Sequence, residues 1–205
     1  MKKIALILSL LASCTAWAQG SIEAGKAKSV TCAACHGTDG NSLITTYPKI
    51  AGQHAKYLEK QLKDLKLGAE TAGKQGRYDP VMSAMAMPLS EQDMADLSAY
   101  YASLPISETS TLEDVVAKGK VLYQAGSIDR GITACIACHG PRGNGTELSG
   151  FPKISGQHAD YVKAQLLKFR ADERSNDMNA MMSDIAKKLT DDDIEILSKY
   201  VGGLH

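Results

Sequence analysis

Two short stretches of the chain place thiol and imidazole side chains at the spacing that covalent haem attachment requires. Both read C-x-x-C-H, with Cys32, Cys35 and His36 in the first half and Cys135, Cys138 and His139 in the second. On one helical turn, the two Cys of such a pentad face the same side and the His lies beside them. Two thiolates can then add to porphyrin vinyl groups while the imidazole becomes the proximal iron ligand. The sequence therefore predicts two haem c groups.

A single C-x-x-C has two other interpretations, half of a zinc site and a thioredoxin-like redox pair. A zinc site would need two further Cys or His at short spacing, and no second C-x-x-C lies near either pentad. A redox pair would need neither a His after its second Cys nor a second copy of the whole unit. Haem attachment is therefore favoured at both pentads.

The pentads belong to an internal repeat that covers most of the chain. Residues 32–41 match 135–144, residues 48–55 match 152–159, and residues 82–86 match 182–186. Between the second and third matches the two copies diverge, and residues 67–81 are expected to form a Gly-rich loop. A duplication within 205 residues predicts two small domains that share one architecture.

Helical periodicity dominates both halves, and neither half contains a convincing strand. Ser21 and Thr111 are expected to cap the helices that open the two halves, and Ser90 and Thr190 the helices that close them. The predicted fold class is all-α, with two tandem domains that each wrap around a covalently bound haem. The predicted bounds are 19–105 for the first domain, 106–111 for a linker and 112–205 for the second domain.

The N-terminal residues 1–18 have the pattern of a secretory signal peptide. Lys2 and Lys3 precede an apolar run, and Ala16-Trp17-Ala18 forms an A-x-A cleavage site; the apolar run is too short to span a membrane. An alternative is that residues 11–14 form a lipoprotein processing site, which would leave a lipidated Cys14 as the first residue. Both alternatives imply export to an oxidising compartment.

Composition limits the choice of partners and supports a bound cofactor. Lys plus Arg and Asp plus Glu are equal at 23 each, so the bulk charge does not favour nucleic acid as a partner. The chain has only two Phe, and its one Trp lies at position 17. A porphyrin in each half would supply the apolar bulk that such small domains otherwise lack.

The sixth iron ligand decides the functional class, because a haem closed on both faces by His and Met is an electron carrier. Both halves contain several Met, but a shared architecture requires the ligand to occupy one position of the repeat. When the two copies of the repeat are aligned, only Met82 and Met182 occupy the same position. The other methionines align with different residue types: Met85 with Ile185, Met87 with Lys187, Met178 with Tyr78 and Met181 with Val81. Met82 and Met182 are therefore the predicted axial ligands.

Other matched residues are candidates for supporting roles. Pro48 and Pro152 follow their haem His by 12 and 13 residues, and a nearby carbonyl could accept the proton of the second imidazole nitrogen. His54 and His158 are expected to act as caps, propionate partners or inter-domain hydrogen-bond donors, with iron ligation less favoured.

Three further matched pairs have roles that the sequence leaves open. Tyr57 and Tyr161 are expected either to bind a propionate or only to pack, and Lys66 and Arg170 either to meet a propionate or to lie at a solvated helix end. The remaining pair is Gly25 and Gly119, which are expected where two helices cross closely.

Each half resembles a class I cytochrome c, with an opening helix, C-x-x-C-H, a middle helix after Pro-Lys-Ile-x-Gly-Gln, a Met-bearing loop and a closing helix. The exported tandem, with its segments at 150–158 and 175–177, is similar to the dihaem cytochrome c4 family over essentially the whole mature chain. The resemblance implies covalent attachment through the four pentad Cys. It also implies axial ligation by His36 and Met82 in one half and by His139 and Met182 in the other.

The resemblance further implies a periplasmic electron carrier, often membrane-associated, that passes electrons from a quinol-oxidising complex to a terminal oxidase. No catalytic residue and no small-molecule substrate are expected. Two alternatives remain at this point: a cytochrome subunit of a flavoprotein or reductase complex, and a dihaem peroxidase-like enzyme with an open or displaceable iron ligand.

Overall fold

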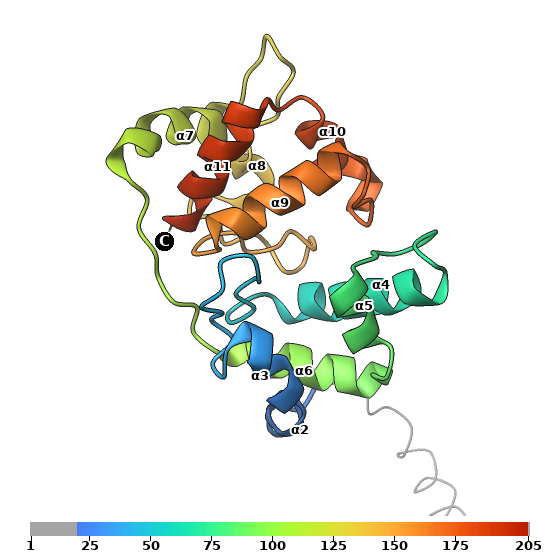
Figure 1. Cartoon of the computed structure of the whole chain (residues 1–205). Helices are drawn as coiled ribbons and strands as arrows, with labels where there is room; N and C mark the ends of the chain where they lie inside the picture. The colour runs from blue at the N-terminus through green and yellow to red at the C-terminus, as the bar shows by residue number, and fades with distance from the viewer. Residues whose placement is uncertain (1–19, 205) are drawn as a thin grey trace, which may run out of the picture.

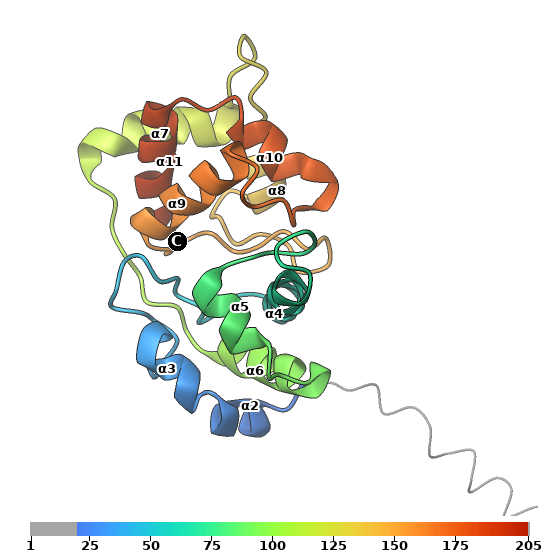
Figure 2. The same ribbon diagram turned by 45° about the vertical axis from the view of Figure 1, so that its right-hand side comes forward.

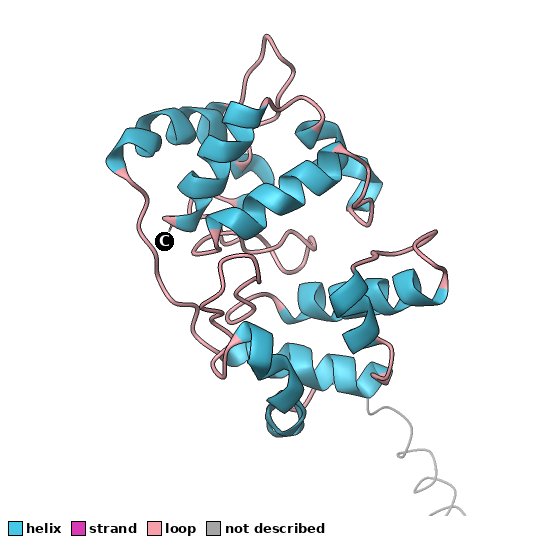
Figure 3. Cartoon of the chain, viewed as in Figure 1, coloured by secondary structure: helices cyan, strands magenta, loops and turns pink. Residues whose placement is uncertain are grey.

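The computed structural model describes residues 20–204, which fold into two helical domains joined by an extended linker (Figure 1). The first domain contains α2 (Ile22–Lys28), α3 (Val30–His36), α4 (Ala55–Glu70), α5 (Pro80–Ala86) and α6 (Glu91–Ser103). The second contains α7 (Glu113–Ala125), α8 (Ile136–His139), α9 (Ala159–Arg170), the 3-10 turn η1 (Met178–Ala180), α10 (Met181–Ala186) and α11 (Asp191–Gly202). Over the described range there are helices and loops but no strand (Figure 3), so the all-α prediction is confirmed.

The closing helices α6 and α11 carry the core of each domain. Leu97, Tyr100 and Tyr101 of α6 are buried, and α11 contributes the corresponding Leu197 and Tyr200. The predicted caps of these helices are confirmed as capping boxes: each cap side chain accepts from the third helical residue, an Asp whose carboxylate accepts in return. The core of both domains therefore sits along the helix that ends it.

The opening helix of each domain crosses the closing helix at a glycine, as predicted. A Cβ at Gly25 would lie 2.7 Å from the Cβ of Tyr100, and a Cβ at Gly119 would lie 2.6 Å from the Cβ of Tyr200. No side chain fits at these distances, so glycine allows the close helix crossing on which each core depends.

Four local predictions differ from the structure. Thr111 does not cap α7; its hydroxyl donates to the carbonyls of Lys199 and Tyr200 in α11 instead. The expected loop at 67–81 is shorter, because α4 continues to Glu70. The opening helix of the first half, whose predicted course from Ser21 through Ile22, Gly25 and Val30 leads into the first pentad, is broken at Ser29 into α2 and α3. The expected Met-bearing loop contains short helices, α5 and α10, and the two candidate Met lie on them.

The segment between Leu104 and Glu113 is extended and is bonded to both domains. Asn41 and Lys49 bind its first part: the amide of Ser107 donates to Asn41 Oδ1 (2.7 Å), and Lys49 Nζ donates to the carbonyl of Ser107 (3.0 Å). Thr109 binds its last part to the carbonyl of Gly202 in α11. The predicted linker, residues 106–111, lies within this extended segment. The domain bounds 19–105, 106–111 and 112–205 stay predictions.

The two domains pack through a reciprocal pair of glutamine side chains. Gln157 accepts from the amide of Lys49 (2.9 Å) and donates to its carbonyl (2.8 Å). Gln53 binds the backbone of Lys153 in the same way, at 2.9 and 2.7 Å. Both glutamines are buried and come from matched positions of the repeat, so the interface has an approximate two-fold relation.

His54 and His158 also bind across the interface, which confirms their inter-domain role. His54 Nε2 lies 2.8 Å from the carbonyl of Asn144, and His158 Nε2 lies 2.7 Å from the carbonyl of Ser42. A carbonyl only accepts, so each imidazole donates from Nε2. Figure 2 shows the loops that make these contacts between the two sets of helices.

Among residues 20–204, no helix combines the length and apolar character that a membrane crossing would need. The predicted signal peptide at 1–18 and the alternative site at Cys14 lie outside the described residues.

Replacing Gln157 by Ala should lower the free energy of unfolding of the haem-loaded protein by about 2 kcal/mol, because the buried amide and carbonyl of Lys49 lose their partners. Denaturant titration of the variant against the wild type measures this loss. Gln124→Ala, at an exposed position of α7, is the matched control. An equal effect of the two substitutions would contradict the assigned role.

Asp96 should make the first domain sensitive to acid. Its carboxylate is 2% exposed and accepts from Lys28 Nζ and from the amide of Ser21, each at 2.9 Å. These donors, with Lys28 the largest contribution, hold the pKa of Asp96 below its ordinary value. The stabilisation is therefore complete above the pKa of the unfolded chain and is lost as the pH falls through the folded pKa.

We expect Asp96→Asn to destabilise the protein at pH 7 and to weaken the loss of stability below about pH 4, the ordinary pKa of Asp. Denaturant titrations at a series of pH values test this, with exposed Glu70→Gln as the control. An acid limb that the Asp96 substitution leaves unchanged would show that other carboxylates govern it.

Candidate haem sites

The cysteine and histidine side chains of each pentad project from a short helix that ends directly after the histidine. The first pentad lies in α3, whereas the second begins at Cys135, the N-cap of α8. Gly37 and Gly140 end these helices with φ values of 81° and 75°, a conformation that glycine adopts without strain. The chain can thus turn away at once, and the four pentad Cys are free thiols of intermediate exposure.

A second loop lies against the pentad in each domain and reaches its histidine. In the first domain the amides of Ile50 and Ala51 donate to the carbonyl of Gly40 at 2.8 and 3.1 Å, and Ile154 and Ser155 repeat this with Gly143. These bonds place the preceding proline next to the imidazole. His36 Nδ1 lies 2.9 Å from the carbonyl of Pro48, and His139 Nδ1 lies 2.9 Å from the carbonyl of Pro152, as predicted.

This hydrogen bond fixes the tautomer of both imidazoles. A carbonyl oxygen cannot donate, so Nδ1 carries the proton and Nε2 keeps a lone pair that can bind a metal. His36 is 5% exposed and His139 is 7% exposed. Burial lowers the pKa of both imidazoles more than the hydrogen bond to the proline carbonyl raises it, so both are neutral at pH 7.

The two candidate axial methionines occupy equivalent places on α5 and α10. Asp79 caps α5 and accepts from the amide of Met82 (3.0 Å), while Asp177 fixes α10 by accepting from the amide of Ser183 (2.9 Å). Met82 and Met182 are both half-buried. By contrast, the competing Met85, Met87 and Met178 are 40%, 43% and 50% exposed. Burial therefore favours the same pair as the repeat, with half-buried Met181 as the remaining alternative.

The residues of each domain fit a covalently bound haem. Each supplies two free thiols, one neutral imidazole with an available Nε2, and a half-buried thioether. The apolar cores reach the attachment points, because Cys32 packs against the α6 cluster and Cys135 packs against the α11 cluster. The described residues contain no group of three or more His, Cys, Asp or Glu arranged for a metal ion.

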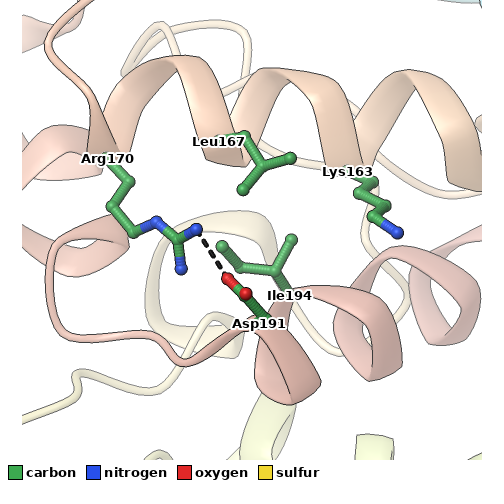
Figure 4. A pocket seen from close by; sticks show the side chains of 5 residues that line it. All are labelled: Lys163, Leu167, Arg170, Asp191 and Ile194. Atoms are coloured by element: carbon green, nitrogen blue, oxygen red, sulfur yellow. Dashed lines mark hydrogen bonds and ion pairs between the residues drawn. The ribbon is translucent and has the colours of Figure 1, made fainter.

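Lys66 and Arg170 bind the start of the closing helices. Lys66 Nζ donates to the carbonyl of Leu89 (2.7 Å), and Arg170 donates to the carbonyl of Leu189 (3.3 Å). Arg170 also pairs with Asp191 beside a small hollow between α9 and α11, which Lys163 and two aliphatic side chains help to line (Figure 4). These contacts join the middle and closing helices of each domain, and a propionate role for this pair stays a prediction.

Tyr57 and Tyr161 meet two arginines that the sequence did not single out. Arg174 donates to the hydroxyl of Tyr57 (3.0 Å), and Arg77 lies 3.5 Å from the hydroxyl of Tyr161, so each arginine binds a tyrosine of the other domain. Burial raises the pKa of Tyr161, but Arg77 and Arg174 outweigh burial and lower it overall. The arginines follow α4 and α9 at positions where the repeat copies diverge, so no matched position pointed to them.

Comparison with known proteins gives one consistent result. The sequence model of the Cytochrome c family matches residues 22–105 and again residues 116–205. Cytochrome c4 of Stutzerimonas stutzeri is 43% identical over 98% of this chain and 98% of its own. The crystal structure of reduced recombinant cytochrome c4 from Pseudomonas stutzeri is 44% identical, has a TM-score of 0.88, and is matched over 91% of this chain and 100% of that chain.

A more distant relative is named thiosulfate dehydrogenase electron acceptor, from Stutzerimonas stutzeri strain A1501. It is 35% identical over 83% of this chain and 77% of its own. The more similar relatives are electron carriers, so the peroxidase-like alternative is not supported. Together with the two helical domains and the twin pentads, these similarities show that the chain belongs to the cytochrome c family, as a dihaem electron carrier of the cytochrome c4 type with two haem c groups.

Proposed function

We propose that His36 and Met82 ligate the iron of one haem and that His139 and Met182 ligate the iron of the other. Cys32, Cys35, Cys135 and Cys138 form the thioether links. The observation that carries this proposal is the matched bond from each buried histidine Nδ1 to a proline carbonyl, which leaves Nε2 as the only ring nitrogen able to bind iron.

A site of this kind moves electrons without binding a substrate. A bound haem would supply a one-electron iron couple, and a methionine ligand such as Met82 or Met182 would raise its potential. The proline carbonyls hold the imidazoles in one orientation, and Asp79 and Asp177 hold the helices that carry the methionines. Because these contacts are preformed in the fold, little rearrangement accompanies the gain or loss of an electron.

We further propose that the protein works in the periplasm, where it takes electrons from a quinol-oxidising complex and delivers them to a terminal oxidase. The support is the signal-like sequence at 1–18 and the similarity to cytochrome c4. Peripheral association with the membrane belongs to the same proposal. Mixing the reduced protein with oxidase-containing membranes and following its reoxidation tests the acceptor; the absence of reoxidation under aerobic conditions would contradict it.

A second candidate is docking to a dehydrogenase as its dedicated electron acceptor. The observation in its favour is the 35% identity to a protein named thiosulfate dehydrogenase electron acceptor. This candidate is a variant of the earlier alternative in which the chain is a subunit of a flavoprotein or reductase complex. The electron donor differs, but the proposed iron sites are the same. Copurification of a dehydrogenase with the native protein would favour it over the quinol-oxidising donor.

Replacing Met182 by Ala should open one iron and leave the other unchanged. We expect the reduced variant to bind one equivalent of carbon monoxide and the potential of that haem to fall, because the thioether that favours the reduced iron is lost. Met82→Ala should do the same for the other haem. Visible spectra under carbon monoxide and redox titration measure both effects.

Met85→Ala, at an exposed position on α5, is the matched control and should not bind carbon monoxide. If Met182→Ala keeps the spectrum and potential of the parent, another residue is the ligand, and Met181→Ala then becomes the variant to measure. Ready binding of carbon monoxide by the unaltered reduced protein would contradict the assignment for both haems.

A further inference from the structure

The helix crossing in each core carries an additional tyrosine, but the two domains take it from opposite helices. Four residues after the crossing glycine, the opening helix has Ser29 in the first domain and Tyr123 in the second. Both positions are buried, at 8% and 0% exposure. Ser29 ends α2, whereas α7 continues for two residues beyond Tyr123. The opening helix therefore brings this ring only to the second domain.

The closing helix shows the opposite arrangement. One residue after the tyrosine that faces the crossing glycine, α6 has Tyr101 and α11 has Val201, each 3% exposed. Tyr101 lies beside Ser29, and Tyr123 and Val201 belong to one buried cluster. A small residue on one helix is thus matched by a tyrosine on the other, so each core receives one additional tyrosine ring.

Packing alone does not explain why this ring carries a hydroxyl. The ring centroids of Tyr100 and Tyr101 lie 5.1 Å apart with 54° between the planes, and those of Tyr123 and Tyr200 lie 5.5 Å apart with 52°. Phenylalanine would make the same ring contacts. A hydroxyl that is buried without a hydrogen bond is costly, so the position of each hydroxyl needs a polar partner.

The hydroxyl of Tyr123 donates to the carbonyl of Gly140 at 2.6 Å. Gly140 directly follows His139 and ends the pentad helix α8. The amide of Gly143 donates to the same carbonyl at 3.2 Å, and the carbonyl of Gly143 holds the proline loop. The tyrosine therefore fixes the chain between His139 and the loop that orients its imidazole.

The hydroxyl of Tyr101 meets a different part of its pentad. Cys32 packs against the buried cluster that contains Tyr101, and a Cβ at Gly40 would lie 3.0 Å from Cδ1 of the ring. The Cys32 thiol and the Ser29 hydroxyl both lie within hydrogen-bonding reach of the Tyr101 hydroxyl. Ser29 gives its own proton to the carbonyl of Lys26 (2.8 Å), so toward Tyr101 it can only accept. The Tyr101 proton thus has two acceptors to choose from, Ser29 Oγ and Cys32 Sγ.

Both hydroxyls keep their protons at neutral pH. Burial is the main cause that raises the pKa of Tyr101 and of Tyr123, and the nearby Cys32 and Cys135 raise it further. A protonated phenol donates one hydrogen bond, so each domain has one fixed donor at its pentad. A thioether sulfur still accepts weakly, so Cys32 can keep such a bond after haem attachment.

We propose that Tyr101 and Tyr123 are positioning residues that raise the reduction potential of the haem in their own domain, Tyr101 by donating to the Cys32 sulfur and Tyr123 by donating to the Gly140 carbonyl next to His139. This inference rests on the attachment and ligation proposed above. Each hydrogen bond draws electron density from an atom that is bonded to the haem or adjacent to its ligand, and this favours the reduced iron.

Reduction potentials of both haems in Tyr101→Phe and Tyr123→Phe, measured by voltammetry on the haem-loaded protein, test the proposal. Each variant keeps the ring and loses only the hydroxyl. We expect the ratio of oxidised to reduced haem at a fixed potential to rise roughly threefold in the variant's own domain, or about 28 mV for a one-electron couple, and to stay unchanged in the other domain. Tyr100→Phe and Tyr200→Phe remove the hydroxyl of the other ring in each pair and should change neither potential.

Two further measurements separate this tuning from a purely structural role. NMR of the reduced protein with ¹³C-labelled cysteine and glycine should show a shifted Cys32 β-carbon in Tyr101→Phe and a shifted Gly140 carbonyl in Tyr123→Phe. Ser29→Ala removes the competing acceptor and leaves the Cys32 sulfur to accept the Tyr101 proton. This variant should therefore not lower the potential of the first haem.

Unchanged potentials and NMR signals in the phenylalanine variants would overturn the proposal. A fall of the first potential in Ser29→Ala as large as in Tyr101→Phe would place the Tyr101 bond on Ser29 and overturn the role of Cys32. Equal changes in both haems would overturn the restriction to one domain. Met82→Ala and Met182→Ala test the axial ligands separately and identify which potential belongs to which domain, so failure here is distinguishable from failure of the proposed iron sites.

Discussion

The structure depends on the hydrogen bond from a buried imidazole to a proline carbonyl, made once in each domain. This bond requires the pentad helix to end directly after its histidine, and Gly37 and Gly140 allow this. It also requires the proline loop to lie against the pentad, and the carbonyls of Gly40 and Gly143 hold it there. The same loop then continues into the middle helix. The orientation of the imidazole and the packing of the domains therefore both follow from the position of one short segment.

That segment also explains why the interface lies where it does. The lysine after each proline offers its backbone to a glutamine of the other domain, and the glutamine comes from the equivalent loop. The bonds are to main-chain atoms, so they depend on the conformation of the loop rather than on the side chain of the lysine. The residues that orient the two buried imidazoles and those that join the two domains are thus neighbours in the chain.

Sequence reasoning predicted the parts of the molecule that are repeated and local. The pentads, the capping boxes at Ser90 and Thr190, the glycine crossings and the proline carbonyls each depend on a short pattern that occurs twice, and each was found. The predicted helix cap at Thr111 was wrong, because a capping pattern alone cannot reveal that the carbonyls of α11 compete as acceptors for the Thr111 hydroxyl. The length of α4 was underestimated because glycine at 68 suggested a loop, whereas it allows the carbonyl of Arg77 to approach the helix.

The inter-domain arginines could not have been predicted in this way. A repeat identifies residues that do the same work in both halves, but the segments after α4 and α9 differ in length and sequence between the two halves. Arg77 and Arg174 therefore lie at different repeat positions, although they share the acceptors Gln61 and Gln165. Only the folded arrangement brings them together.

The linker has a consequence for the strength that the interface needs. Asn41 and Lys49 fix its first part to one domain, and Thr109 and Thr111 fix its last part to the other. A tether this short keeps each domain at a local concentration, with respect to the other, in the millimolar range or above. Domain packing is then an intramolecular association, and a few polar contacts suffice to keep it closed. Both redox centres can thus stay at a fixed separation without the large apolar surface that two free proteins would need for a stable complex.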